Sequence, residues 1–231
     1  MEISVDGKIV GSRWPDEDRA EREFEGLHDR TKPDAWLCGR VTMRYFAGAE
    51  RKAPLRLLPG EKPKPAGTIH RAAPNATSFA VAVDASGKLL WKKNEVEGDH
   101  VVVLLTGGVP EAHLAFLRKR GVSYFVAGAR QIDFPGALSG LRRFFGIKRL
   151  TVEGGGTINA SLLHAGLIDE LSLLLFPVAD GCSATKSLFQ TPQPSPVPQA
   201  TALRLISVRR RPGGVLWLRY RVLKSQGPAV R

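Results

Sequence analysis

The stretch that decides the fold is KRLTVEGGGTINASLLHAGLIDELSLLLFPV, residues 148–178. It opens with a short apolar strand at 148–152 and continues with three glycines at 154–156. A helix is expected over 157–165, with Gly166 as its stop, and a second buried strand over 169–178. A strand, a glycine loop, a helix and a further strand in this order form one repeat of an α/β fold.

The chain on the N-terminal side of this stretch shows the same alternation of strands and helices. Strands are expected at 2–8, 35–38, 78–83, 100–105 and 122–127, and helices at 16–30, 40–47, 110–120 and 136–146. After residue 178 a hairpin over 203–223 turns at Pro212-Gly213-Gly214. The pattern predicts an α/β fold with a mostly parallel central sheet and an antiparallel C-terminal hairpin.

We expect one domain over residues 1–231, because the part before residue 48 is too small to bury a core alone. A share of 43% hydrophobic residues is enough for a globular core, and no apolar run approaches the roughly 20 residues that cross a bilayer. Cys38 and Cys182 are too few for a disulfide framework. A reduced, cytoplasmic compartment is therefore the expectation.

The formal net charge of +12 is confined to two stretches. Residues 49–77 hold six basic residues, two acidic residues and five prolines, which predicts a long cationic insertion or lid. Residues 204–231 hold seven arginines, Lys224 and no acid, and a Pro-rich connection over 180–202 precedes them. Such charge attracts phosphates on a cofactor, a substrate or RNA. A basic nucleic-acid-binding protein is thus the alternative from a different functional class.

Two glycine turns lie between a strand and a helix. Gly154-Gly155-Gly156-Thr157 lets the backbone approach a ligand, and the following helix N-terminus offers free N–H groups to a pyrophosphate. In the second turn, Gly39 precedes Arg40 and Thr42, which can both reach phosphate oxygens. The alternatives are a tight turn without ligand and an N-cap threonine beside a solvated arginine. Taken together, the turns predict that both flank one cofactor.

Glu153 is the candidate for chemistry, because it ends a parallel strand at the edge where open α/β sheets place their ligands. It can hold a substrate hydroxyl or amine, or it can be an exposed charge. The five histidines show no ligand spacing, so no metal site is expected. No GxSxG nucleophile elbow occurs in the chain.

These residues resemble the dihydrofolate-reductase-like superfamily, and within it the reductase domain of the bifunctional riboflavin-biosynthesis deaminase/reductase. The resemblance rests on Ile3-Ser4-Val5-Asp6-Gly7-Lys8-Ile9, on Gly39–Thr42, and above all on the run from Val152 to Leu171. It implies a three-layer fold, a homodimer, and NADPH as the hydride donor.

The resemblance also implies roles for individual residues. The cofactor-binding set is Ile3, Trp14, Arg40, Thr42, Gly155, Gly156, Thr157 and Ile158. The substrate-binding set is Ser12, Arg30 and Glu153, with Glu153 also the candidate proton donor beside water. Within the cofactor set, Arg40 is placed for a phosphate such as the 2′-phosphate.

The chain departs from the family at Met43-Arg44-Tyr45-Phe46, which replaces the segment that grips the substrate phosphate. The expected reaction is hydride transfer from NADPH to a C=N or C=O carbon of a phosphorylated heterocyclic substrate, of the 5-amino-6-(5-phosphoribosylamino)uracil type. The alternative within the same class is a reductase of another pterin-like or small carbonyl substrate.

Overall fold

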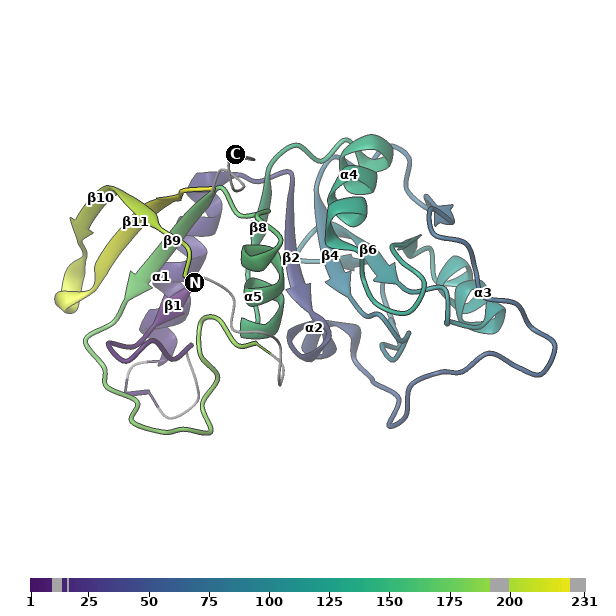
Figure 1. Ribbon diagram of the computed structural model, residues 1–231, viewed down its shortest axis with the longest axis horizontal. Helices are drawn as coiled ribbons and strands as arrows, with labels where there is room; N and C mark the ends of the chain where they lie inside the picture. The colour runs from purple at the N-terminus through teal and green to yellow at the C-terminus, as the bar shows by residue number, and fades with distance from the viewer. Residues whose placement is uncertain (10–13, 16, 192–199, 225–231) are drawn as a thin grey trace, which may run out of the picture. The chain divides into compact units, whose positions relative to one another are not determined.

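The computed structural model describes residues 1–9, 14–15, 17–191 and 200–224 (Figure 1). The chain divides into two units. One, here called the terminal unit, contains Met1–Lys32 and Gly154–Arg231; the other, the central unit, contains Pro33–Glu153. The expectation of a single domain stays a prediction, and each unit is described by itself.

The central unit is built on a seven-stranded sheet. Five parallel strands form its body: β2 (Ala35–Gly39), β4 (Phe79–Val83), β6 (Asp99–Leu105), β7 (Ser123–Val126) and β8 (Leu150–Val152). The spatial order is β3-β7-β6-β4-β2-β8, with β3 (Ile69–His70) and β5 (Glu95–Val96) paired antiparallel to β7 and β6. The predicted mostly parallel sheet is confirmed.

Helices cover both faces of this sheet, because successive residues of a buried strand point to opposite sides. Met43 of α2 (Arg40–Ala47) and Leu117 of α3 (Glu111–Lys119) share one core with Trp36 and Cys38. On the other face, the ring of Phe145 in α4 (Phe134–Phe145) packs against the ring of Phe79 in β4, with the two centroids 5.7 Å apart. The central unit therefore has the three layers that the resemblance implied.

The terminal unit has a four-stranded sheet in the order β1-β9-β11-β10. Its strands are β1 (Glu2–Ile3), β9 (Glu170–Leu175), β10 (Leu203–Arg210) and β11 (Leu216–Val222), with the short helix η1 (Pro212–Gly214) at the hairpin turn. One face packs on α1 (Glu17–Thr31), where Leu27 joins Leu174 and Phe176. The other face buries Leu171 and Leu173 and receives Leu163 of α5 (Gly156–His164).

Most predicted elements are confirmed within one or two residues. The strand predicted over 2–8 is much shorter, because β1 covers only Glu2–Ile3, and the strand predicted over 169–178 ends at Leu175. Three further features also differ. The hairpin belongs to the sheet of β1 and β9, not to the edge of the parallel sheet. The 49–77 segment contains a strand, β3, which its lack of periodicity did not indicate. The fifth helix begins at Gly156, one residue before the predicted start.

The 49–77 segment is also attached to the central unit along its length. Backbone hydrogen bonds run from Arg51 to Lys88 (2.8 Å), from Lys64 to Gly107 (2.9 Å) and from Gly67 to Val126 (2.9 Å). The Glu61 carboxylate accepts from the backbone N–H of Glu111, the first residue of α3. These bonds argue against a segment that is weakly ordered throughout; its behaviour as a lid stays a prediction.

Candidate functional site

The carboxyl ends of β2, β4 and β8 meet at one edge of the central sheet. β2 and β8 are parallel neighbours, with Leu37 opposite Val152, and the Glu153 N–H donates to the Leu37 carbonyl at 2.9 Å. Arg40 begins α2 immediately after β2. Parallel strands end together at one edge, so Arg40 and Glu153 follow strands that stop side by side. The topology therefore confirms that both residues follow the ends of neighbouring parallel strands, while their roles toward a ligand stay predictions.

Arg40 is not a solvated arginine, because its guanidinium forms an ion pair with Glu50. The same carboxylate lies 3.8 Å from the Arg44 guanidinium and 3.5 Å from the Lys88 ammonium. An open depression of about 460 Å³ lies here. Its lining residues are Arg44, Gly48, Ala49, Glu50, Arg51, Lys52 and Lys88.

Asp84 is a residue at this edge that the sequence reasoning missed. It follows β4 directly and is fully buried. One carboxylate oxygen accepts from the Leu89 N–H at 2.7 Å, and the other has no hydrogen-bond partner among the described residues. Burial raises the pKa of Asp84, and the amides of Leu89 and Lys88 and the charge of Arg40 oppose this. An acidic residue directly after a buried strand is the signal that singled out Glu153, and it would have found Asp84 as well.

Glu153 is half-buried and accepts a hydrogen bond from the Thr151 hydroxyl at 3.2 Å. Its charge also reaches Cys38 on the neighbouring strand. Burial, and to a lesser degree Glu153, raise the pKa of the Cys38 thiol far above its usual range. Cys38 is therefore a neutral core residue and not a nucleophile. Of these two residues, Glu153 stays the candidate for chemistry.

The glycine turn of the terminal unit contains two glycines with different environments. Among the described residues, a Cβ added to Gly155 would meet nothing within 4 Å, so these residues leave the backbone there open to a ligand. A Cβ on Gly156 would lie 2.2 Å from the Ser187 carbonyl oxygen, and the Gln190 N–H donates to the Gly156 carbonyl at 3.0 Å. Gly156 is thus required by the packing of residues 187–190, whereas Gly155 has no such requirement.

Both predicted anion sites are helix starts without a side-chain cap. Gly155 precedes α5 and Gly39 precedes α2, and neither residue supplies a side chain that caps the helix. Thr157 is exposed in the first turn of α5, beside the half-buried Ile158. Thr42 is half-buried in the first turn of α2 and does not act as the N-cap. N–H groups and the helix dipole at such ends favour a negatively charged group.

The remaining predicted site residues have less distinctive surroundings. Ile3 is 8% exposed in β1, among Leu171 and Leu173. Trp14 is buried against Phe176, and its indole N–H points to the Asp180 carboxylate at 3.4 Å. Arg30 is exposed in the last turn of α1, and Ser12 lies outside the described residues. Their roles toward cofactor and substrate stay predictions.

No group of three or more histidine, cysteine, aspartate or glutamate residues in the described part of the chain is arranged to hold a metal ion. Within the same residues, no helix combines the length and apolar character needed to cross a membrane.

Comparison with known proteins identifies relatives along most of the chain. The family model of the RibD C-terminal domain matches residues 1–217. A 2,5-diamino-6-ribosylamino-4(3H)-pyrimidinone 5′-phosphate reductase from Methanothermobacter thermautotrophicus is 29% identical over 190 residues, 80% of this chain and 79% of that protein. The Aquifex aeolicus protein of the same name is 28% identical over 195 residues, 78% of this chain and 75% of its own.

Solved structures show the same fold. A pyrimidine reductase-like protein from Corynebacterium diphtheriae aligns over 97% of this chain and 90% of its own, with a TM-score of 0.66 at 18% identity. RibD from Acinetobacter baumannii aligns over 96% of this chain and 56% of its own, with a TM-score of 0.60 at 20% identity. With a family match over nearly its full length and the fold of these reductases, the chain belongs to the RibD C-terminal domain family.

Proposed function

We propose that the chain is an NADPH-dependent reductase of the riboflavin pathway that acts on a ribosylaminopyrimidine 5′-phosphate. Family membership and the reductase names of both curated relatives make it an oxidoreductase.

The observation that carries the cofactor assignment is the start of α5. Gly155 leaves open space before a helix whose first turn has no side-chain cap. An anionic pyrophosphate fits such a helix start, where it would accept from backbone N–H groups of Gly156 and Thr157. We assign this role to residues 155–158, with Gly156 contributing its amide while its missing Cβ serves the packing on Ser187.

The preference for NADPH over NADH is assigned to Arg40. A guanidinium at the end of β2 offers a charge-assisted contact to a 2′-phosphate, worth roughly 1.5–3 kcal/mol. Thr42, in the same helical turn, supports the assignment with a hydroxyl at the start of α2.

The substrate assignment follows the curated relatives, which are named for the 2,5-diamino-pyrimidinone phosphate. The nicotinamide, when bound, supplies the hydride. The C=N or C=O carbon of the opened ribose would accept this hydride, and the nitrogen or oxygen of that bond would accept a proton. Glu153 at the end of β8 and water are the two proton sources. The remaining residues act by holding the reactants in position.

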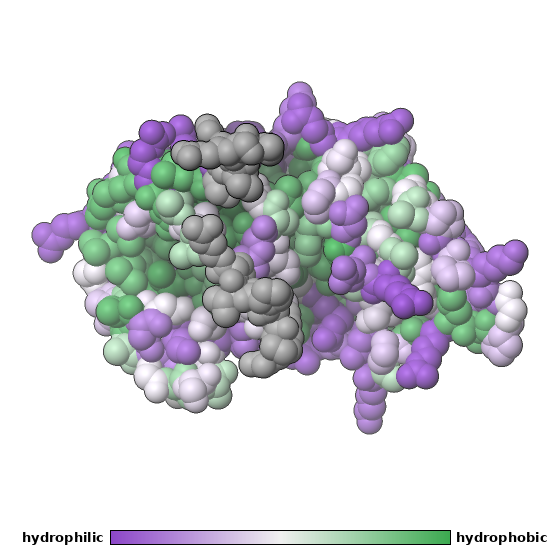
Figure 2. Space-filling model, viewed as in Figure 1, coloured by the Kyte–Doolittle hydropathy of each residue, from purple (hydrophilic) through white to green (hydrophobic). Residues whose placement is uncertain are grey.

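We further propose a homodimer through the hairpin. β10 is an edge strand, and its side chains Leu205 and Val208 are 52% and 50% exposed. Figure 2 shows apolar residues gathered over the sheet of the terminal unit. An exposed edge strand with apolar side chains favours pairing with a second copy. Light scattering should give twice the chain mass, and a Leu205→Lys, Val208→Lys double variant should give the monomer.

Turnover measurements test the function directly. The chain is mixed with NADPH and either 2,5-diamino-6-ribosylamino-4(3H)-pyrimidinone 5′-phosphate or 5-amino-6-(5-phosphoribosylamino)uracil. We expect loss of NADPH absorbance with the first compound and a product that carries two additional hydrogens by mass spectrometry. Turnover of the uracil compound alone would move the assignment to the other substrate. Salt-sensitive RNA binding without any NADPH oxidation would favour the nucleic-acid alternative.

A further inference from the structure

Glu50 occupies the middle of a cationic cluster in the central unit. Its side chain is only 13% exposed, and it faces Arg40, Arg44 and Lys88. Arg51 and Lys52 line the same depression, so Glu50 is its single carboxylate among four lining cations. The Nε atom of Arg51 is buried and has no partner among the described residues. The buried Asp84 carboxylate also lies near enough to feel the charges of Arg40 and Lys88. The five basic side chains of this cluster still outnumber its two carboxylates.

The backbone fixes Glu50 in this place. Residues 47–51 run antiparallel to 88–92, through hydrogen bonds from Lys92 to Ala47 (3.2 Å), from Leu90 to Ala49 (3.0 Å) and from Arg51 to Lys88 (2.8 Å). Glu50 itself forms a β-bridge with Leu89. The backbone position of Glu50, next to Lys88 and Leu89, is therefore a property of the fold.

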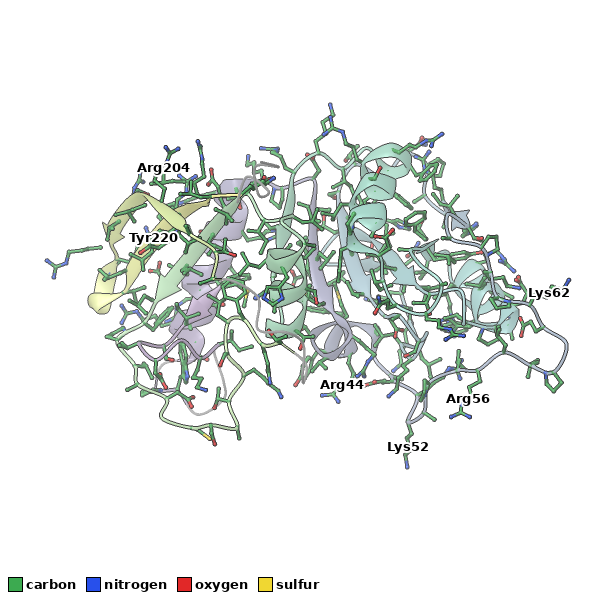
Figure 3. The ribbon with its side chains drawn as sticks, viewed as in Figure 1. Arg44, Lys52, Arg56, Lys62, Arg204 and Tyr220 are labelled. Carbon is green, nitrogen blue, oxygen red and sulfur yellow. The ribbon has the colours of Figure 1, made fainter. Side chains whose placement is uncertain are left out.

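Asp84 holds the residue next to Lys88 in place. Its carboxylate accepts from the Leu89 N–H, next to Lys88, and Leu89 is fully buried. Lys88 is consequently held beside Glu50, and its side chain is 18% exposed. Figure 3 shows Arg44 and Lys52 on the same side of the central unit, with Lys52 pointing away from the ribbon.

A carboxylate held by two guanidinium groups and an ammonium has the interactions that a phosphate would make there. We propose that Glu50 is an internal counter-anion: it occupies the place of a phosphate monoester, which must displace it from Arg40 to bind. The inference rests on the proposed function for the identity of the monoester, which is either the 2′-phosphate of the cofactor or the 5′-phosphate of the substrate. Glu50 then lowers the affinity for the phosphate and sets how strongly the site distinguishes a phosphorylated ligand from one without phosphate.

The test uses calorimetry on the full chain with three probes. These are 2′,5′-ADP, ADP as its counterpart without the 2′-phosphate, and ribose 5-phosphate for the substrate side. Glu50→Gln keeps the size of the side chain and removes the charge. Glu95→Gln removes an equal charge from an exposed position on β5 of the same unit, as the matched control.

We expect Glu50→Gln to bind one phosphate monoester about tenfold more tightly, with ADP affinity changed less than twofold and Glu95→Gln unchanged. A higher affinity for 2′,5′-ADP would identify the site as that of the cofactor 2′-phosphate. A higher affinity for ribose 5-phosphate would identify it as that of the substrate 5′-phosphate. Unchanged or weaker binding of both monoesters overturns the proposal, since Glu50 would then only hold Arg40 in place. Absence of monoester binding in both proteins overturns it as well.

A second variant keeps the proposal falsifiable if Glu50→Gln does not fold. Lys88→Met should weaken the same monoester at least fivefold, and an unchanged affinity contradicts the cationic site. The outcome is separate from that of the proposed function: NADPH turnover with no effect of Glu50 leaves the reductase standing without this counter-anion. A tighter monoester in Glu50→Gln with no hydride transfer leaves the counter-anion without the reductase.

Discussion

The two glycine turns look alike in sequence and differ in structure. The turn before α5 carries no charged side chain between Gly154 and Ile158, and Gly155 is open. The turn before α2 leads into Arg40, whose charge is already paired with Glu50. The turn before α5 offers a ligand only backbone amides. The turn before α2 offers the Arg40 guanidinium, for which a ligand must compete with Glu50. A shared strand–glycine–helix pattern therefore supports two different ways of holding a phosphate.

The largest expected effect is a loss of stability at low pH in the central unit. His113 of α3 is 2% exposed in the central unit, and both its ring nitrogens lack a partner among the described residues. Burial, helped by the charge of Arg51, lowers its pKa from 6.5 to about 4. The unfolded chain takes up a proton near pH 6.5 while the folded chain does not. Stability is thus complete above that pH and is lost as the pH falls toward 4, by about 3 kcal/mol.

Urea unfolding at pH 7 and pH 4 measures this loss. His113→Leu should lose about 3 kcal/mol less free energy of unfolding than the wild type over this range. Hydrogen exchange at low pH should show the central unit opening first. If the wild type and His113→Leu lose the same free energy of unfolding at low pH, His113 is not the source of the acid sensitivity. His100 would then be the next residue to test, because burial lowers its pKa as well.

Neighbouring glycines in the α5 turn provide the second comparison. Gly156→Ala should lower the free energy of unfolding by about 2 kcal/mol, because its Cβ would meet the Ser187 carbonyl oxygen at 2.2 Å. Gly155→Ala should change it by under about 0.5 kcal/mol, since φ is −83° and the space is open. Thermal unfolding measures both. Gly155→Ala should still weaken NADPH binding, and an unchanged affinity would remove the cofactor from this turn.

The third prediction concerns the charged turn. Arg40→Met should weaken NADPH about tenfold and leave NADH within twofold, because only NADPH carries the 2′-phosphate. Calorimetry with both cofactors measures the difference. Equal weakening of the two would mean that Arg40 supports the turn and does not read the phosphate.

The smallest effect compares exposed cations of the 49–77 segment with exposed cations on and after α4. Lys52, Arg56 and Lys62 belong to the 49–77 segment (Figure 3). Their triple replacement by glutamine should raise KM for the anionic substrate two- to threefold at low salt and have no effect at high salt. The control replaces Arg142, Arg143 and Lys148, exposed on and after α4. An equal effect of both triple variants would indicate general attraction by the net charge rather than a lid.

The sequence by itself determined the order of the elements and the position of both glycine turns. Apolar runs such as Ala35–Cys38 and 100–105 favour buried strands, Gly39 precedes a helix, and Gly166 follows the end of another through local backbone preference. These signals involve residues close in the chain, which is why most predicted bounds hold to one or two residues; the strands predicted over 2–8 and 169–178 are shorter in the structure. The run from Val152 to Leu171 likewise carried the family resemblance, and the family match over residues 1–217 confirms it.

Tertiary structure alone decided which strands pair and which charges meet. β11 of the hairpin pairs with β9, and Leu171 and Leu173 of β9 are buried in one cluster with Val222 of β11, a choice that no local pattern encodes. Ile69 and His70 become a strand only because β7 offers an open edge. Arg40 meets Glu50 because residues 47–51 pair with 88–92, and Gly156 is required by Ser187, thirty-one positions later. Such contacts depend on the path of the chain, and composition and spacing along it do not contain them.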